Sequence, residues 1–433
     1  MSADGLNPSI LFVLYQFPPS NDVGAQRPVR FIKHLWKRGW QVFVVAPANG
    51  VYYSYAPQGV AEIAQYCHVI RVPMIFPAPG RTSIHPGPLR LRIWRAWNRL
   101  AVPDGALAWL PAAVATGIQA VRRHRIPLIV ASGQPFSVFL AAALIRKYTE
   151  TALIFDYRDL WTLNPFYKGS RPRRAFETQL EKYAVRNSFA SVFVNEECRR
   201  IQTAKLCGPG RHLTITNGFE ALPQPARSET KPGFRIVYAG NFYGNRSPMF
   251  FLRGLADACA RNPKLARHTR VDFFGVYDHR RIARDCERLG LAAIVRLNHR
   301  IPRSELLQKL QQASLLLLIN SYGPGHEMNL PAKFFDYLSV EKPILCLAER
   351  GALKDAVIRT GAGVVVDPRD IKSVSERLGD FYRNWSRRKP VFRLDPKKIR
   401  PFRASETGDQ FERLCRELMA AFRETSKNKT LYR

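Results

Sequence analysis

The stretch NLPAKFFDYLSVEKPIL, residues 329–345, has the pattern of a helix that runs directly into a buried strand. Short apolar runs that follow helix-length segments are typical of strands covered on both faces. A helix joined to such a strand is part of a βαβ unit, and successive βαβ units build a parallel sheet. The stretch therefore predicts an α/β fold.

The same alternation of helix and strand patterns continues outward in both directions. In the second half of the chain, short apolar runs lie near Arg235, Val271, Ile294, Leu315, Pro343 and Gly363. In the first half, they lie at 9–15, 41–46, 128–132, 151–157 and 191–195. Two such series predict two doubly wound, Rossmann-like domains that face each other across a cleft.

The segment ALPQPARSETKPG, residues 221–233, is the predicted linker, because it is rich in proline, serine and charge and separates two strand patterns. This places an N-terminal domain at 1–220 and a second domain at 234–400. An amphipathic helix at 409–422 stands apart from the last strand. We predict that residues 401–433 pack back toward the N-terminal domain.

The charge is the strongest signal in the composition. The 433 residues include 67 lysines and arginines against 34 acidic residues, a formal net charge of +33 at pH 7. Such an excess attracts polyanions, among them nucleic acid, an anionic membrane leaflet and phosphorylated substrates. The alternative is a lineage that simply favours arginine.

The cysteines and the apolar runs bear on the cellular compartment. The seven cysteines are scattered, with no CxxC pair and no histidines at zinc-site spacing, which favours reduced thiols in a cytosolic protein. The N-terminus has no basic region before its first apolar run, so a signal peptide is not predicted. The longest apolar run, residues 136–145, covers about half of the length that a spanning helix needs. We expect a cytoplasmic protein without a transmembrane segment.

Residues that follow the predicted strands are candidates for the functional site, because ligands of open parallel sheets bind at the carboxyl ends of the strands. After the first strand, Gly24 would permit the close approach of a ligand, or simply form a turn. After the strand at 151–157, Arg158 could hold a phosphate and Asp159 could orient a hydroxyl. A local ion pair at the end of the strand is the alternative.

The loop YAGNFYGNRSP, residues 238–248, combines glycines with a helix start. Gly240 loosens the turn, Asn241 and Arg246 supply hydrogen-bond donors, and the Ser-Pro pair begins a helix with a cap and a first-turn proline. Glycines, a basic residue and a helix start together suit a phosphate.

Lys333 and Asp336 lie close to Pro331, which is expected in the first turn of its helix. A cation in the first turn is unfavourable unless an anion binds there, because that end of the helix dipole is positive. The arrangement fits a nucleotide diphosphate, with its phosphates at Lys333 and its ribose hydroxyls at Asp336. The alternative is an ion pair between these two side chains, which share one helix face.

In their order and spacing, these segments resemble the retaining GT-B-fold glycosyltransferases of family 4 over roughly residues 9–378. Residues 10–47 look like that family's opening strand, glycine loop and helix. ASGQPFSVFLAAALIRK, followed by IFDYRDLW, resembles the branch with an Arg-Asp-x-Trp sequence. ITNGFE, YAGNFYGNRSP and LPAKFFDYLSVEKPIL look like its interdomain strand, phosphate loop and donor-binding helix.

The resemblance implies a nucleotide-sugar donor, bound mainly by the C-terminal domain, and a transfer that retains anomeric configuration without a cofactor or metal. It implies that Arg246 and Lys333 act on the leaving phosphate, and we assign Arg158 and Asp159 to the acceptor side. The implied donor-binding residues are Gly24, Gly240, Asn241, Arg246, Glu327, Asn329, Leu330, Lys333 and Asp336.

The sequence departs from the family pattern at several of these positions. Asp336 stands where the family usually has a glutamate, and Met328 stands where many members have a second one. Glu327 is one residue out of register with that second glutamate. A histidine often found in the N-terminal site has no clear match, although Gln134 lies nearby in the sequence.

The segment LRLRIWRAWNR, residues 89–99, has the pattern of a helix that lies on an anionic membrane surface. Its arginines form one stripe, apolar residues form another, and tryptophans lie at the borders. The candidate membrane residues are Arg92, Trp94, Arg95, Trp97 and Arg99. We hypothesise a peripheral protein at the inner leaflet that extends a lipid-linked or cell-surface glycan. A basic, solvated helix covering the N-terminal domain is the alternative.

Two other functions are compatible with the sequence. A nucleotide-sugar epimerase can share this fold and donor site, but it would act without an acceptor. A nucleic-acid-binding protein would explain the charge, but the aromatic residues follow core periodicity and no known binding module is present. We therefore expect a nucleotide sugar and a glycan or lipid-linked acceptor as partners, and no nucleic acid.

Overall fold

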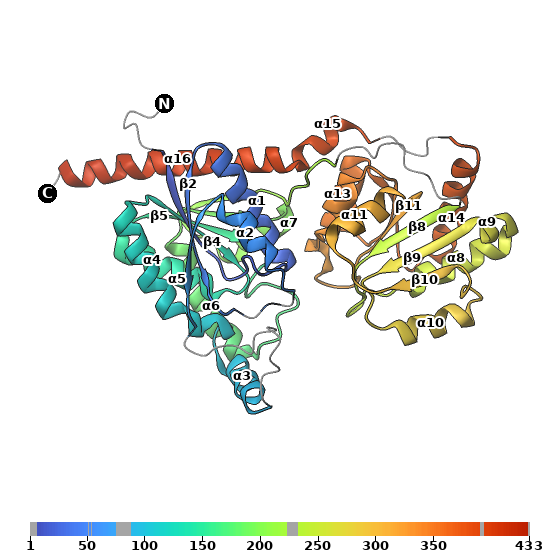
Figure 1. The fold of residues 1–433 in the computed structure, drawn as a ribbon, viewed down its shortest axis with the longest axis horizontal. Coiled ribbons are helices and arrows are strands. Elements are labelled where there is room, and N and C mark those ends of the chain that lie inside the picture. Colours follow the sequence, from blue (N-terminus) through green and yellow to red (C-terminus); the bar gives the residue numbers. More distant parts are fainter. Residues whose placement is uncertain are drawn as a thin grey trace. The chain divides into compact units, whose positions relative to one another are not determined.

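The computed structural model describes residues 7–50, 52, 54–74, 88–222, 233–389 and 394–431, and the chain divides into two units (Figure 1). Unit 1 comprises Met1–Thr216 and Ala404–Arg433, and unit 2 comprises Asn217–Arg403. The predicted boundaries, at 221–233 and at 401, differ from these by a few residues. Most of the predicted linker lies outside the described residues.

Unit 1 is built on a parallel sheet with the strand order β3-β2-β1-β4-β5-β6-β7. The strands are β1 Ser9–Val13, β2 Gln41–Pro47, β3 His68–Val72, β4 Leu128–Gly133, β5 Ala152–Tyr157, β6 Ala190–Phe193 and β7 Arg211–Thr214. The helices are α1 Val23–Lys37, α2 Gln58–Ala64, α3 Pro88–Leu100, η1 Gly105–Trp109, α4 Leu110–His124, α5 Ser137–Thr149, α6 Arg171–Arg186, α7 Glu196–Lys205 and α16 Ala404–Leu431. The strand order reverses between β1 and β4, which makes this the switch point of the sheet.

The last helix, α16, completes the core of unit 1. Its Phe411 stacks on Phe31 of α1, with ring centroids 4.2 Å apart and planes 6° from parallel. Leu414, Leu418 and Met419 are buried in the same cluster as the strands. These positions recur at helical spacing, so the apolar face of an amphipathic helix covers the sheet.

Unit 2 has a second parallel sheet, with the order β10-β9-β8-β11-β12-β13. Its strands are β8 Phe234–Ala239, β9 Thr269–Phe274, β10 Val295–Asn298, β11 Leu315–Ile319, β12 Ile344–Leu347 and β13 Gly363–Val366. Its helices are α8 Met249–Arg261, α9 Pro263–His268, α10 His279–Arg288, α11 Arg303–Gln311, η2 His326–Met328, α12 Lys333–Ser339, α13 Ala352–Thr360, α14 Ile371–Ser386, α15 Pro396–Ile399 and η3 Arg400–Phe402. Its switch point lies between β8 and β11.

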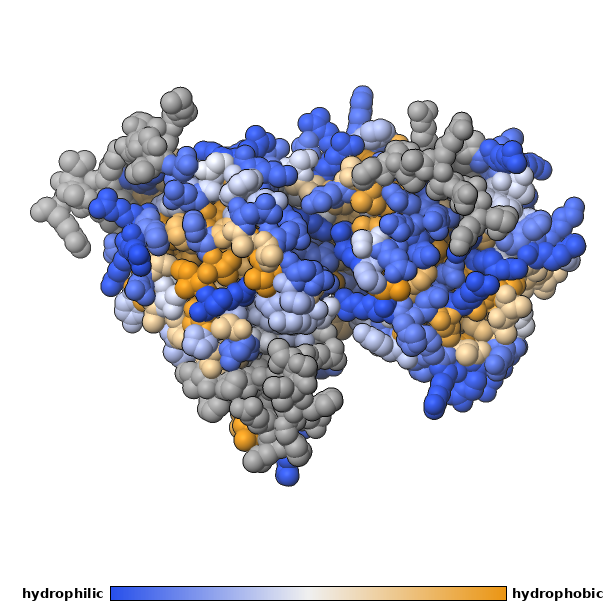
Figure 2. All heavy atoms as spheres, viewed as in Figure 1, coloured by the Kyte–Doolittle hydropathy of each residue, from blue (hydrophilic) through white to orange (hydrophobic). Residues whose placement is uncertain are grey.

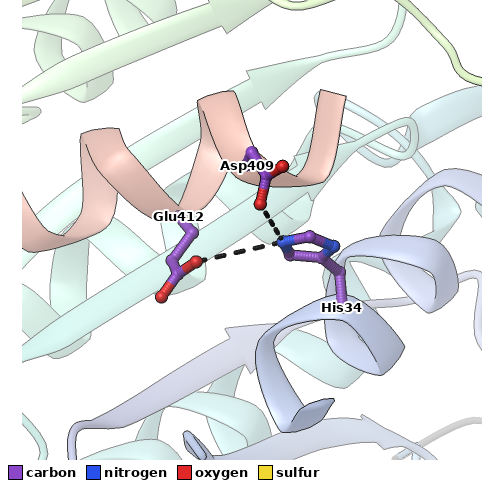
Figure 3. Close-up of side chains that lie close together, drawn as sticks. All are labelled: His34, Asp409 and Glu412. Carbon is purple, nitrogen blue, oxygen red and sulfur yellow. Dashed lines mark ion pairs between the residues drawn. The ribbon is translucent and has the colours of Figure 1, made fainter. Parts of the chain in front are cut away.

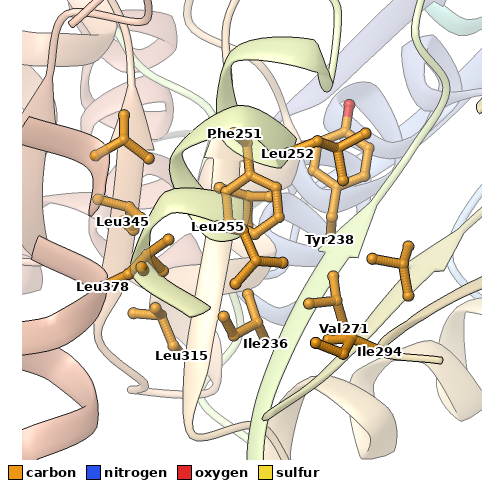
Figure 4. Packing of buried hydrophobic residues seen from close by; sticks show 14 of the residues in the cluster. Ile236, Tyr238, Phe251, Leu252, Leu255, Val271, Ile294, Leu315, Leu345 and Leu378 are labelled. Atoms are coloured by element: carbon orange, nitrogen blue, oxygen red, sulfur yellow. The ribbon is translucent and has the colours of Figure 1, made fainter. Parts of the chain in front are cut away.

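The core of unit 2 is formed where helices cover the strands. Figure 4 shows Leu255 of α8 and Leu378 of α14 over Ile236, Leu315 and Leu345 of the sheet. All five side chains are buried. The described surface in the view of Figure 2 is mostly hydrophilic, with smaller apolar patches.

The prediction of two doubly wound domains is confirmed, and each short apolar run used for it forms a strand. The cleft between the domains stays a prediction. Two elements differ from expectation. Strand β3 was not predicted, because its half-exposed sequence HVIRV lacks a buried pattern. Helix α12 begins at Lys333, so Pro331 precedes the helix instead of occupying its first turn.

Candidate functional site

Arg246 lies in the loop that follows β8, at the switch point of unit 2, and its side chain is only 4% exposed. Its guanidinium lies 4.7 Å from the ring centre of Tyr243, and Nη1 donates to the Tyr243 hydroxyl at 3.1 Å. Its buried Nε finds no hydrogen-bond partner among the residues that the structure describes. Among the described residues, no carboxylate pairs with Arg246. Burying an arginine in this way is costly unless an anion joins it.

Lys333, the first residue of α12, extends toward the same place. Its Nζ donates to the Tyr238 hydroxyl at 3.0 Å and lies 4.2 Å from the centre of that ring. Part of the side chain is accessible, but the ammonium sits in a recess. Burial of the ammonium lowers the pKa of Lys333 well below its usual value, and the positive charge of Arg246 adds a smaller effect in the same direction. No described carboxylate pairs with this ammonium either.

Gly240 directly follows β8 and lies close to the ammonium of Lys333. Its φ of 123° favours glycine, and a Cβ at this position would lie 2.6 Å from Lys333 Nζ. The Tyr238 hydroxyl, which accepts from Lys333, donates in turn to the carbonyl of Asn241 at 3.3 Å. The Asn241 side-chain oxygen accepts from the backbone N–H of Tyr277 at 3.1 Å. The glycine and these hydrogen bonds fix the ammonium at the strand end.

A third basic side chain, His326, belongs to this cluster and was missed by the sequence analysis. Burial and the positive charge of Arg246 lower the pKa of His326. The negative charges of Glu327 and Glu349 raise it by a smaller amount. His326 lies in η2, in the segment that follows β11. Its place at a strand end was the available signal, because the other candidates were found by that criterion.

Two predicted donor-binding carboxylates have protein partners. The Asp336 carboxylate lies 2.5 Å from Arg303 Nη2 of α11, and Glu327 lies 3.7 Å from Arg350. The ion pair considered between Lys333 and Asp336 is therefore absent, since each has a different partner. Asp336 remains 23% exposed, so a ribose contact at this carboxylate stays a prediction.

The remaining two predicted donor-binding residues of unit 2 belong to the segment between η2 and α12. Asn329 donates through its side-chain amide to Asn320 Oδ1 at 2.8 Å, which ties this segment to the end of β11. Leu330 packs against the apolar cluster on the opposite side of the sheet from Figure 4. The structure therefore gives both residues a part in holding the segment, and their donor contacts stay predictions.

In unit 1, Arg158 joins the loops that follow three strands. Its guanidinium donates to the carbonyls of Gly133, at 2.7 Å, and Gln134, and to the side-chain oxygen of Gln16 at 2.7 Å. Burial lowers the pKa of Arg158 to about 10, so it is charged at neutral pH. A Cβ on Gly24 would lie 1.8 Å from its Nη1. Arg158 thus explains this glycine without a ligand, and a donor contact at Gly24 stays a prediction.

The two aspartates beside Arg158 differ in their surroundings. Asp156 is buried against Arg27 of α1, whose Nε lies 2.9 Å from it, and accepts from the Ser132 hydroxyl at 2.7 Å. The Asp159 side chain is exposed, and in the described part of the chain no ion pair engages it. Removal of water by the surrounding chain raises the pKa of Asp159, with Arg158 opposing. Asp156 is structural, and Asp159 is accessible to a ligand.

Two buried glutamates of α6 support the loop that carries Arg158 and Asp159. Glu181 accepts from the Tyr157 hydroxyl at 3.1 Å, from the Thr162 N–H at 3.0 Å and hydroxyl at 2.6 Å, and from Gln202 at 3.0 Å. Glu177 accepts from the Trp161 indole at 2.8 Å and from Arg173 at 2.8 Å. The tryptophan of the Arg-Asp-x-Trp sequence therefore anchors the loop to the helix behind it.

A pocket of about 1020 Å³ opens at the same edge of the unit 1 sheet. Its walls come from the loops after β1, β4 and β5, from the end of α3, from η1 and from the start of α6. These loops flank the switch point, where open α/β sheets bind their ligands. Gln134, near the position of the family's histidine, is one of the lining residues.

The predicted membrane helix, α3, shows part of the expected surface. Ile93 is 53% exposed and Leu100 is 78% exposed, and Arg92 and Arg99 are exposed beside them. The side chains of Trp94 and Arg95 lie outside the described residues. Trp97 differs from expectation, because it is partly buried and its indole donates to the carbonyl of Gly105 at 2.9 Å. Among the described residues, no helix combines the length and hydrophobicity needed to cross a bilayer.

Within the described residues, one group has the spacing of metal ligands: His34 with Asp409 and Glu412 (Figure 3). His34 Nε2 lies 3.2 Å from Asp409 and 3.9 Å from Glu412. Arg38 pairs with Asp409 at 2.5 Å, and Arg416 pairs with Glu412 at 2.7 Å. Since two arginines already balance the carboxylates, the group serves as an ion-paired contact between α1 and α16.

Comparisons with known proteins bear on the fold that carries these residues. Residues 24–218 match the family model of the glycosyl transferase 4-like domain. No curated protein matches the sequence. The chain is similar to the structure of sucrose-phosphate synthase from Thermosynechococcus elongatus, with 15% identity, a TM-score of 0.64 and coverage of 96% of this chain and 100% of that chain. It is also similar to a glycosyltransferase from Rickettsia africae, with 10% identity, a TM-score of 0.67 and coverage of 95% and 99%.

A third similar structure is that of HepE from Anabaena in complex with UDP, with 14% identity, a TM-score of 0.62 and coverage of 95% of this chain and 100% of that chain. Likeness at these identities establishes the fold, which is that of GT-B glycosyltransferases. The segment that matches the glycosyl transferase 4-like domain lies almost entirely in unit 1 of this fold.

Proposed function

We propose that the protein is a glycosyltransferase that moves a hexose from a nucleotide-sugar donor to a glycan or lipid-linked acceptor, with retention of configuration and without a metal. The observation that carries the proposal is the meeting of Arg246 and Lys333 at the switch point of unit 2 with no described carboxylate partner. Two neighbouring, partly desolvated cations favour the binding of an anion. A nucleoside diphosphate supplies one, and the similar structure of HepE holds UDP.

The chemistry of transfer requires such cations. The bond between the anomeric carbon and the diphosphate oxygen breaks with its electron pair on the phosphate, and the acceptor hydroxyl forms the new bond and passes its proton to the departing diphosphate. Arg246 and Lys333, already held in place, stabilise the negative charge that develops on the leaving diphosphate. We assign the ribose to Asp336, the donor sugar to Glu327, and the acceptor side to Arg158 and Asp159.

A panel of nucleotide sugars tests the donor site, because a ligand that binds only the folded protein raises its melting temperature. We expect one of them to stabilise the wild type and the control Lys264→Met, which removes an exposed lysine of α9, but not Lys333→Met. An equal shift in all three proteins would defeat the assignment of Lys333. EDTA is expected to leave transfer unchanged, and donor consumption without any acceptor would point to an epimerase instead.

We further propose that α3 contacts the anionic inner leaflet and that the acceptor belongs to a cell-surface polysaccharide. The support is the exposed apolar stripe of Ile93 and Leu100, which lies beside the stripe of the exposed Arg92 and Arg99. We expect the protein to sediment with vesicles that contain anionic lipid, and to do so less after Ile93→Asn together with Leu100→Asn. Sedimentation that is independent of lipid charge would contradict this proposal.

A further inference from the structure

The charged residues that line the pocket of unit 1 are of two kinds. The carboxylate of Asp104 accepts from the backbone N–H of Phe136 at 2.6 Å and from the Ser137 hydroxyl at 2.7 Å, and that of Glu177 is held by Trp161 and Arg173. Both carboxylates are therefore engaged inside the protein. The cations Arg99 and Lys168 are exposed, and no described carboxylate pairs with them. The charge that a ligand meets in this pocket is positive.

The uncharged part of the lining suits a saccharide. It includes the side-chain amides of Gln16, Asn98, Gln134 and Asn164. Amides both donate and accept hydrogen bonds, which matches the dual character of sugar hydroxyls. Phe166 also lines the pocket and is 50% exposed, so the flat apolar face of a sugar ring can pack against it.

We propose that this pocket binds a saccharide that carries a phosphate group, with the phosphate at Arg99 and Lys168 and the sugar hydroxyls at the amides. Arginine and lysine together match the charge of a phosphate, and the arginine fork can hold two of its oxygens. Naming this saccharide as the acceptor rests on the proposed function. Its binding at the pocket does not.

An exposed apolar side chain follows one of the two cations in the sequence. Leu100, the residue after Arg99, is 78% exposed and is not among the residues that line the pocket. An alkyl chain attached to the phosphate would therefore find apolar contacts as soon as it left the pocket. The same phosphate chemistry can come from a free sugar phosphate or from a lipid-linked sugar, and the difference is measurable.

The test compares three probes by titration calorimetry: methyl α-glucoside, glucose 1-phosphate, and glucose joined through a phosphate to a short isoprenyl chain. The test variant combines Arg99→Gln with Lys168→Gln. The control combines Arg123→Gln with Lys205→Gln, which removes the same charge from the ends of α4 and α7. These helix ends precede strands and so lie at the opposite edge of the sheet.

We expect the wild type and the control to bind glucose 1-phosphate about tenfold more tightly than the uncharged glucoside, as one charged hydrogen-bonding group provides. The test variant is expected to lose this preference. Equal binding of both probes by the wild type, or a preference that survives in the test variant, would overturn the inference. Any phosphate bound at unit 2 affects all three proteins equally and cancels in the comparison.

The third probe identifies the source of the phosphate. Binding tighter than that of glucose 1-phosphate, and equally dependent on the two cations, indicates a lipid-linked saccharide, whereas equal binding indicates a free sugar phosphate. Titration with UDP on the same preparations keeps the two proposals apart. Failure of UDP to bind, with the phosphate preference intact, would remove the proposed function and leave this pocket as a sugar phosphate site.

Discussion

The two sheets differ in how the charged side chains at the carboxyl ends of their strands are paired. In unit 1, Arg158 donates to three oxygens from two neighbouring loops, and Asp156 is paired with Arg27 in the interior. In unit 2, Arg246 donates to the Tyr243 hydroxyl and Lys333 to the Tyr238 hydroxyl, and the charge of Arg246 lowers the pKa of Lys333. The described residues provide no carboxylate partner for either cation.

This difference distinguishes residues that stabilise the fold from residues that are available to bind a ligand. A buried charge with its partner in place costs stability when that partner is removed, whereas a charge without a partner is itself unfavourable until an anion arrives. Substitutions of the internally paired groups of unit 1, such as Asp156, should therefore change stability, and substitutions of Arg246 and Lys333 in unit 2 should change binding and turnover.

The largest expected effect is the loss of activity in Lys333→Met. Removing one preorganised donor to a developing negative charge lowers kcat by about 100-fold or more. The melting temperature of the ligand-free protein should not fall, because an uncompensated ammonium is removed from a recess. Sugar transfer and thermal unfolding are measured on the same preparation, with Lys264→Met as the control. A large fall in melting temperature would mean that Lys333 is structural, and the comparison would break.

The next effect belongs to unit 1. Glu181→Ala leaves the donors of Tyr157, Thr162 and Gln202 without their acceptor, and we expect unit 1 to lose about 3 kcal/mol of stability. Hydrogen exchange of the amides at 157–162 should accelerate accordingly, while UDP binding at unit 2 stays unchanged. Glu196→Ala, which removes an exposed carboxylate of α7, is the control and should cost less than about 1 kcal/mol. Unchanged exchange in Glu181→Ala would show that the glutamate does not hold the loop.

The fold was predictable because most strands are buried apolar runs, which are visible without knowing their neighbours. The exceptions, β3, β7, β10 and β13, are the edge strands of the two sheets and are partly exposed, and of these β3 was not predicted. Of the site, only the residues that follow predicted strands could be found from the sequence. Strand ends indicated Arg246 and Lys333, but it depends on the folded chain that no carboxylate of its described part pairs with either cation.

Other parts of the site carry no local signal. Glu177 and Glu181 lie in a highly charged helix, and nothing in its sequence distinguishes a buried glutamate from an exposed one. Arg303, the partner of Asp336, is 33 positions away in the sequence. The pocket of unit 1 is assembled from segments between residues 15 and 177. Such features follow from tertiary packing, which spacing alone does not encode.

A smaller effect sharpens the assignment of Asp336. If its carboxylate binds the ribose, Asp336→Asn should weaken UDP binding by about tenfold, the loss of one hydrogen bond to a charged group. Arg303→Gln breaks the same ion pair but keeps the carboxylate, so it should leave the affinity almost unchanged. Calorimetry on both variants distinguishes the two roles. Equal losses would mean that Asp336 acts only through its pairing with Arg303.

The smallest effect is the part of the dependence of stability on pH that comes from Lys333 in unit 2. Because the pKa of Lys333 is lowered in the folded protein, its native ammonium loses its proton before the unfolded one does as the pH rises. Between the lowered pKa and the ordinary value of 10.5, the unfolded chain binds more protons, and so the stability of the ligand-free protein rises with pH through this window. The pKa of Lys342 is also lowered, by burial, and contributes equally to the wild type and to Lys333→Met.

The difference between the melting temperatures of these two proteins therefore isolates Lys333. We expect the wild type to gain on Lys333→Met from neutral to alkaline pH, and the gain to vanish with saturating UDP, whose phosphates keep the ammonium protonated. A difference that does not change with pH would mean that the pKa of Lys333 is not lowered in the ligand-free protein. The contrast between the paired charges of unit 1 and the cations of unit 2 that have no described carboxylate partner would then rest on Arg246 alone.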